Sequence, residues 1–213
     1  MIVSHEHRFI FLKTRKTAGT SVEIALSAIC GERDIITPIT HEDEELRSRI
    51  GRGPQNHQSP PLPLPATNHS PARKARTIVG EAVWADYTKV TVERNPWDQV
   101  VSSYYWAART NPDAPTFDVF VRRPRVAKLA DTNARIYRIG GELIADRVLR
   151  FESLSEDLTQ LWGDLGLPGQ PELPRAKSGV RPAVAYQDLY DDEARDLVRS
   201  LFAASIRDFG YDF

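Results

Sequence analysis

The chain has 213 residues, of which 41% are hydrophobic and 27% charged, so it suits one domain with a large core, and global disorder is excluded. The 28 Lys and Arg residues are balanced by 29 Asp and Glu, and the net charge of −1 gives no whole-molecule attraction to nucleic acid or an anionic membrane surface. No apolar run approaches the roughly 18 residues of a membrane span, and Cys30 is the only cysteine, so we expect a cytoplasmic protein without an export signal or a disulfide.

The first predicted elements are a strand and the helix that follows it. Arg8–Leu12 (R-F-I-F-L) is apolar without alternation, which is typical of a strand buried on both faces in a parallel sheet. From Thr20 the apolar residues recur at helical spacing, Thr20 and Glu23 match a capping box, and Gly31 is placed to end the helix. The sequence therefore predicts a strand, a short polar loop and a helix.

Residues 32–70 interrupt this pattern. They contain an acidic run at His41–Glu45, and six prolines fall between Pro54 and Pro71. Because proline removes a backbone donor and fixes φ, we expect a long excursion outside the core, of the kind that often carries specificity.

The rest of the chain again alternates strands with helices. Lys89–Glu93 and Arg147–Phe151 are predicted strands, and Asn95 with Pro96 opens a helix. The other predicted helices cover Pro71–Tyr87, Ser155–Leu165 and Asp191–Asp208. This alternation predicts one α/β domain over residues 1–213, with a central parallel sheet flanked by helices. Ligands of such sheets bind beyond the carboxyl ends of the strands, so both sharp strand-to-helix junctions are expected to face one crevice.

The first junction, Lys13–Ser21, reads K-T-R-K-T-A-G-T-S. A loop of small residues that enters a helix directs backbone N–H groups and the positive end of the helix dipole at one point, which suits a phosphate. The loop is not a Walker A motif, because Lys16 precedes Gly19 and no glycine lies upstream in the loop. The structural alternative is that Thr17–Ser21 only caps the helix.

The second junction, Glu93–Ser102, reads E-R-N-P-W-D-Q-V-V-S. Arg94 stands at the end of a strand, and Ser102 lies about two turns into the helix, so the two side chains can converge on one anion. The structural alternatives are an ion pair of Arg94 with Glu93 or Asp98, and a hydrogen bond of Ser102 within its own helix.

These junctions resemble those of the sulfotransferases that use 3′-phosphoadenosine 5′-phosphosulfate (PAPS), in particular the carbohydrate-type branch with bacterial members. The segments that carry the resemblance are Lys16–Ser21, Arg94–Asp98 with Ser102, Tyr104–Trp106, Arg150–Leu154 and Phe209–Tyr211. The resemblance implies a P-loop-like fold. Residues 31–67 are its least matched part, and the long excursion at residues 32–70 is expected to form an acceptor-side loop. It also implies transfer of a sulfuryl group from PAPS to a hydroxyl of a carbohydrate or another small molecule, with adenosine 3′,5′-bisphosphate as product and no metal.

The resemblance also assigns the residues that bind the cofactor. Those expected to hold the 5′-phosphosulfate are Lys13, Arg15, Lys16, Thr17, Ala18, Gly19, Thr20 and Ser21. Arg94 and Ser102 are expected to bind the 3′-phosphate. The basic segment Arg175–Arg181 is similar to the segment that covers the nucleotide in the family, which adds Lys177, Ser178 and Arg181, with a solvated loop as the alternative.

Two residues are expected to carry the catalysis. The resemblance places Lys16 at the oxygen that bridges phosphate and sulfate, where negative charge grows in the transition state. His69 stands just before a predicted helix, close to where family members place their catalytic base, and a histidine titrates near neutral pH. His57 is the reserve candidate and Glu81 a more distant one, and a surface position is the alternative for His69.

Two other functions are compatible with the sequence. A nucleotide or small-molecule kinase would share the loop and require Mg²⁺, although the position of the loop lysine argues against it. A non-catalytic nucleotide-binding module would keep the crevice without turnover. We expect no metal site from His5, His7 and Cys30, because two histidines near a terminus are usually solvated.

Overall fold

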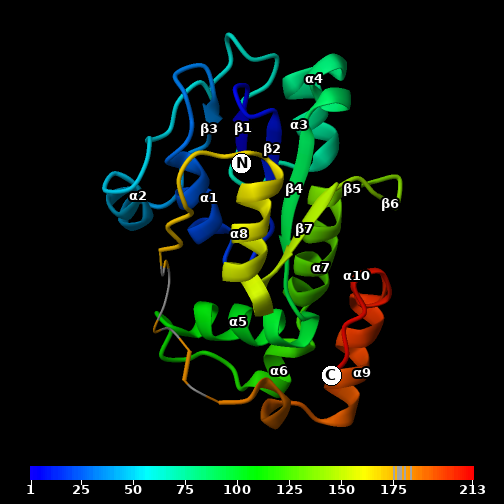
Figure 1. Ribbon diagram of the computed structural model, residues 1–213. Helices are drawn as coiled ribbons and strands as arrows, with labels where there is room; N and C mark the ends of the chain where they lie inside the picture. Colours follow the sequence, from blue (N-terminus) through cyan, green and yellow to red (C-terminus); the bar gives the residue numbers. More distant parts are fainter. Residues whose placement is uncertain (175, 177–178, 180, 183) are drawn as a thin grey trace. The chain divides into compact units, whose positions relative to one another are not determined.

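The computed structural model describes every residue except 175, 177, 178, 180 and 183 (Figure 1). The chain divides into two compact units. Unit 1 comprises Met1–Glu93 and Arg135–Ala176, and unit 2 comprises Arg94–Ala134 and Lys177–Phe213. Within the described part of the chain, no helix has both the length and the apolar character needed to cross a membrane.

Unit 1 is built on a mixed sheet of five strands in the order β3-β1-β2-β4-β7. The strands are β1 (Ile2–Ser4), β2 (Phe9–Leu12), β3 (Ile35–Ile36), β4 (Thr88–Glu93) and β7 (Arg147–Arg150). The parallel pairs are β2 with β4 and β4 with β7, whereas β1 runs antiparallel to both of its neighbours. The expectation of an all-parallel sheet is therefore wrong at β1. Only four residues join β1 to β2, and so short a connection permits only antiparallel pairing.

Helices cover both faces of this sheet (Figure 1). Phe9 and Phe11 of β2 pack on one face with the apolar side chains of α1 (Gly19–Ser27) and α8 (Leu154–Asp164). Ile10 and Leu12 point to the opposite face and pack with α3 (Ala72–Val79), α4 (Glu81–Asp86) and the end of α7 (Pro124–Tyr137). Burial on both faces explains why β2 is apolar without alternation, as the sequence predicted.

Two helices that the sequence predicts as continuous are divided. The predicted helix Pro71–Tyr87 breaks into α3 and α4 at Gly80, whose φ of 80° lies outside the helical range. The predicted helix Asp191–Asp208 forms α9 (Asp192–Leu201) and α10 (Ala203–Phe209), which meet at Phe202. After the first break Trp84 is buried and Ala82 is exposed, and the apolar spacing of the sequence did not reveal either break.

The expectation that residues 32–70 lie outside the core is also wrong in part. They contain β3, which pairs with β1, and α2 (His41–Arg47), whose last residue is fully buried. Ala66, inside the proline-rich stretch, is buried in the same apolar cluster as residues of α3. The proline content correctly indicated an irregular backbone, but it gave no information on how far these residues are buried.

The remaining elements are short. In unit 1, β5 (Arg138–Ile139) and β6 (Glu142–Leu143) form a small hairpin, and the 3-10 turn η1 (Phe151–Ser153) leads from β7 into α8. Unit 2 consists of α5 (Pro96–Ala108), α6 (Phe117–Val121), most of α7, the 3-10 turn η2 (Tyr186–Leu189), α9 and α10. Aromatic side chains hold it together in edge-to-face contacts, among them Tyr104 with Phe117 and Phe120, and Phe213 with Trp97 and Tyr190.

Candidate functional site

The loop between β2 and α1 has an unusual backbone. Lys16 and Ala18 have φ values of 65° and 61°, in the left-handed region that residues with a Cβ seldom occupy. Left-handed residues in a turn can direct successive backbone N–H groups into one concavity, which is a common way to bind an anion. The first turn of α1 contains no acidic residue, so the positive end of its dipole is not offset there.

The predicted capping box at Thr20 and Glu23 is wrong. The N-cap of α1 is Ala18, which has no side chain that could cap, and the carboxylate of Glu23 is fully buried. The structural alternative for this loop, a helix capped by its own hydroxyl side chains, is therefore not what the structure contains at the N-cap.

Hydroxyl groups tie the loop to its surroundings. The Thr14 Oγ1 and Thr17 Oγ1 atoms lie 2.8 Å apart, and the Thr14 hydroxyl also donates to the carbonyl of Val92 in β4. Ser21 Oγ accepts a hydrogen bond of 3.3 Å from the backbone N–H of Ala176. Ala176 belongs to unit 1 and to the predicted nucleotide-covering segment, and this hydrogen bond places it against the start of α1. Around it, Arg15 is exposed, Lys16 is half-buried, and Thr17, Gly19, Thr20 and Ser21 are buried.

Lys13 differs from the other cations of the loop. Its side chain is only 3% exposed, and its Nζ lies 2.7 Å from Glu23 Oε2. The lysine stem passes so close to Gly19 that a Cβ at that glycine would lie 2.9 Å from Lys13 Cγ. The ammonium of Lys13 is therefore paired inside the protein, and its predicted contact with the nucleotide stays a prediction.

Glu23 is the centre of a buried group of charges. Its Oε1 lies 2.9 Å from the Met1 ammonium, 3.1 Å from Thr37 Oγ1 and 3.6 Å from Arg47 Nη2. Burial raises the pKa of Glu23, but the charges of Lys13, Met1 and Arg47 outweigh that effect and hold the pKa at about 2. Glu23 is thus an ionised carboxylate in the core, which the sequence did not reveal because its position suggested a helix cap.

His69 is bonded to the same loop. Its Nδ1 lies 2.9 Å from the carbonyl oxygen of Lys13, and because a carbonyl only accepts, Nδ1 carries the proton and Nε2 keeps a free lone pair. Burial lowers the pKa of His69 to about 3; the hydrogen bond to Lys13 opposes this shift, and the nearby charges of Lys13, Arg15 and Met1 add to it. The imidazole is therefore neutral near pH 7 and can accept a proton at Nε2.

The other two candidate bases have different surroundings. His57 lines a pocket of about 320 Å³ formed by residues 54–58, 60 and 61. Glu81 is exposed and forms an ion pair with Arg76, 2.6 Å between Oε2 and Nη2. Of these three candidates, His69 is the one for which the described contacts include a hydrogen bond to the loop.

In unit 2, a single carboxylate receives two arginines. Asp98 Oδ2 lies 2.6 Å from Arg94 Nη2 and 2.7 Å from Arg94 Nε, and Asp98 Oδ1 pairs with Arg181. Ser102 follows Asp98 by four residues on α5 and therefore lies on the same helix face. The ion pair of Arg94 with Asp98 is the structural alternative that the sequence predicted for this arginine. Asp98 also brings Arg94 and Arg181 together within unit 2. Lys177 and Ser178 lie outside the described residues.

The N-terminus of α5 forms as the sequence predicts. Asn95 Oδ1 accepts from the backbone N–H of Trp97 at 3.1 Å, and Pro96 is the first helical residue. Asn95 Nδ2 donates to Tyr186 Oη at 3.2 Å and to the carbonyl of Asp212 at 2.7 Å. The cap residue therefore also connects α5 to the end of the chain.

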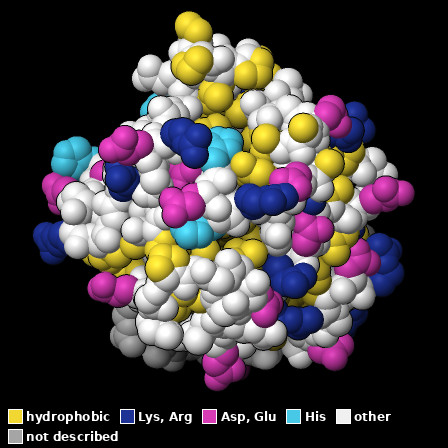
Figure 2. Space-filling model, turned by 45° about the horizontal axis from the view of Figure 1, so that its top comes forward, with side chains coloured by type: hydrophobic (Ala, Val, Ile, Leu, Met, Phe, Trp, Pro, Cys, Tyr) yellow, Lys and Arg dark blue, Asp and Glu magenta, His cyan; other side chains and the backbone are white. Residues whose placement is uncertain are grey.

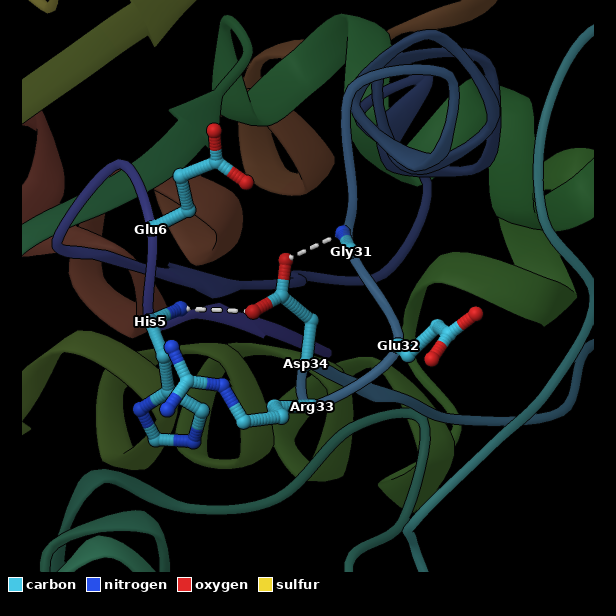
Figure 3. Close-up of a pocket in the computed structure, with 6 residues that line it drawn as sticks. All are labelled: His5, Glu6, Gly31, Glu32, Arg33 and Asp34. Atoms are coloured by element: carbon cyan, nitrogen blue, oxygen red, sulfur yellow. Dashed lines mark hydrogen bonds between the residues drawn. The ribbon is translucent and has the colours of Figure 1, made fainter.

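Two further features of the surface bear on ligand binding. On the face that Figure 2 presents, Lys and Arg side chains are interspersed with Asp and Glu rather than gathered into one patch. A pocket of about 310 Å³ lies between the β1–β2 turn and residues 31–34 (Figure 3). Its Asp34 carboxylate accepts from the backbone N–H of His5 at 2.7 Å and of Gly31 at 2.9 Å (Figure 3), so this side chain holds two turns together. The described residues contain no group of three or more His, Cys, Asp or Glu side chains suited to a metal.

Comparison of the chain with protein-family models and with curated proteins finds no match.

Proposed function

We propose that this protein transfers the sulfuryl group of PAPS to a hydroxyl of a carbohydrate acceptor and releases adenosine 3′,5′-bisphosphate. The observation that carries the proposal is the β2–α1 junction, where a loop with left-handed Lys16 and Ala18 enters an uncapped helix while a neutral histidine is bonded to the first residue of the loop. The motif resemblance of Lys16–Ser21 and Arg94–Ser102 supports the same activity. In this proposal the junction is P-loop-like.

The loop would bind the 5′-phosphosulfate. Backbone N–H groups at the start of α1, with the side chains of Arg15, Lys16, Thr17, Thr20 and Ser21, supply donors and positive charge for it. Lys16 is assigned to the bridging oxygen, where charge develops as the sulfuryl group leaves. A cation already placed there stabilises the transition state more than the ground state.

His69 would act as the general base. As the acceptor oxygen forms its bond to sulfur, the bond from sulfur to the bridging oxygen breaks, and the bisphosphate leaves with that electron pair. The hydroxyl proton goes to His69 Nε2, the nitrogen that the bond to Lys13 leaves unprotonated. The negative charge of the bound donor would offset the nearby cations and raise the pKa of His69, which makes it a stronger base when PAPS is present.

Arg94, Ser102, Lys177, Ser178 and Arg181 are assigned to the 3′-phosphate by the resemblance. Guanidinium groups suit this role because they offer paired N–H donors to phosphate oxygens. Two of these residues, Arg94 and Arg181, share the carboxylate of Asp98.

Calorimetric titration tests the cofactor class. We expect adenosine 3′,5′-bisphosphate to bind more tightly than ATP with Mg²⁺. Arg94→Ala should weaken bisphosphate binding at least tenfold, or ~1.4 kcal/mol, because it removes a charge-assisted contact, whereas Lys128→Ala on the exposed side of α7 serves as a control without effect. Tighter binding of ATP with Mg²⁺ would instead favour a kinase.

Transfer from PAPS to a panel of oligosaccharides tests the chemistry. Lys16→Ala should lower the rate by about a hundredfold while the fold is preserved, because the variant loses charge stabilisation at the leaving oxygen. A wild-type rate in Lys16→Ala would remove the role of that lysine. Tight bisphosphate binding without transfer to any acceptor would indicate a binding module instead.

A further inference from the structure

Lys13 and Glu23 form a buried ion pair next to the β2–α1 loop, and the proposed function assigns no role to it. Lys13 is 3% exposed and Glu23 is fully buried, with 2.7 Å between Nζ and Oε2. A buried ion pair is not the most stabilising choice for a core, because apolar side chains of similar volume often serve as well or better. We therefore infer the role of the pair from its position at the two ends of the loop and not from its contribution to stability.

The lysine side chain spans the loop from end to end. Lys13 directly follows β2, its stem lies against Gly19 at the first position of α1, and its ammonium reaches Glu23 one turn further along that helix. The two ends of the loop are thus held together by one side chain. Left-handed Lys16 and Ala18 lie between them, and such residues persist only where their surroundings determine the backbone strongly.

The same residue is also hydrogen-bonded to His69. The carbonyl oxygen of Lys13 accepts a hydrogen bond of 2.9 Å from the imidazole Nδ1. Because the ion pair restrains the residue, it also restrains this carbonyl, and with it the tautomer that leaves Nε2 as the basic nitrogen.

We propose that Lys13 and Glu23 are a positioning pair, which holds the phosphate loop closed from below and keeps His69 protonated on Nδ1. This inference rests on the proposed function. It gives Lys13 a role different from the nucleotide contact that the resemblance implies, because its ammonium is directed to Glu23.

The test compares Lys13→Met with Lys16→Met, the same chemical change three positions later. Lys13→Met keeps the aliphatic stem beside Gly19, and Glu23 keeps the Met1 ammonium, Thr37 and Arg47 as neighbours, so we expect the variant to fold. Two quantities are measured: the His69 tautomer, by long-range ¹H–¹⁵N NMR of the imidazole, and the dissociation constant for adenosine 3′,5′-bisphosphate.

We expect Lys13→Met to convert His69 from the Nδ1-protonated form to a mixture of tautomers and to weaken bisphosphate binding at least about threefold, because the two ends of the loop are no longer held together. Lys16→Met should weaken binding at least about tenfold and leave the tautomer unchanged. An unchanged tautomer or an unchanged affinity in Lys13→Met, or the same change of tautomer in Lys16→Met, would overturn the inference.

A second variant tests the route from Glu23. Glu23→Gln introduced together with Lys13→Met should add no further change in the His69 tautomer, because Glu23 acts through the lysine. An additional change would refute that route. Failure of the wild-type protein to bind the bisphosphate would count against the proposed function, whereas the tautomer measurement would still decide whether the pair positions His69.

Discussion

Lys13, Ala18 and Gly19 shape the loop before α1 in different ways. Ala18 adopts a left-handed conformation that costs a residue with a Cβ about 1–2 kcal/mol. Gly19 has an ordinary φ but leaves the space that the Lys13 stem occupies. Ala18 stores strain, and Gly19 avoids a clash with the Lys13 side chain.

Substitutions at these two adjacent positions should therefore have opposite effects. Gly19→Ala brings a Cβ to 2.9 Å from Lys13 Cγ and 3.4 Å from the Thr14 carbonyl. Because the lysine is restrained by Glu23, we expect the free energy of unfolding to fall by about 1–3 kcal/mol. Ala18→Gly relieves the left-handed Cβ and should raise it by about 0.5–1 kcal/mol after the added flexibility of the unfolded chain is included. Urea denaturation of both variants measures the changes, and equal stabilities would contradict this account of the loop.

At the scale of elements, the start of α5 gathers charged and polar side chains on one face. Arg94, Asp98 and Ser102 recur every four residues, and Arg181 joins them through Asp98. The side chains of Arg94 and Asp98 are only 10% and 13% exposed, so their ion pair is shielded from solvent more than a surface pair is. Asp98 thus holds two guanidinium groups at the face where the resemblance expects a phosphate.

Asp98→Asn should destabilise the protein. The amide cannot neutralise two arginines, and hydrogen bonds to charged groups contribute about 1.5–3 kcal/mol each, so we expect a loss of about that size in the free energy of unfolding. Asp196→Asn is the matched control, because Asp196 also pairs with two arginines, Arg195 and Arg199, but at the exposed surface, where a much smaller effect is expected. Thermal and urea unfolding report the difference, and comparable losses in the two variants would show that Asp98 is no more than a surface ion pair.

At the scale of the whole molecule, the buried charges predict how stability depends on pH. His69 and the Met1 ammonium have lowered pKa values, from 6.5 to about 3 and from 8.0 to about 6, and burial is the largest cause of both. The unfolded chain therefore binds protons at higher pH than the folded protein does. Both groups therefore contribute to the free energy of unfolding at high pH. This contribution is lost as the pH falls from 8 to 6 for Met1 and from 6.5 toward 3 for His69. Glu23, lowered from 4.5 to about 2, loses its contribution below pH 4.5.

We therefore expect the free energy of unfolding to decrease steadily from pH 8 to pH 4, with a slope of at most about 1.4 kcal/mol per pH unit for each proton taken up. His69→Asn, whose amide can still donate to the Lys13 carbonyl, should flatten the curve between pH 6.5 and 4. His41→Asn, at an exposed position, should leave the slope unchanged. Urea unfolding at a series of pH values provides the curves, and an unaltered slope in His69→Asn would show that His69 is not the group responsible.

Local sequence patterns by themselves determined the elements that are long or strongly marked. The strands β2, β4 and β7, the helix α8, and α5 with its Asn95 cap follow from apolar runs, helical spacing and cap chemistry, because these are interactions between near neighbours in the chain. The β2–α1 loop was located for the same reason.

Only the tertiary structure decided which distant residues meet. β1 and β3 are too short to show a period, and their pairing makes the sheet mixed. The partners of Glu23 come from four separate segments, the bond of His69 to Lys13 spans 56 residues, and Arg181 reaches Asp98 across 83. Such contacts depend on how the sheet and helices pack, and no local pattern encodes that packing.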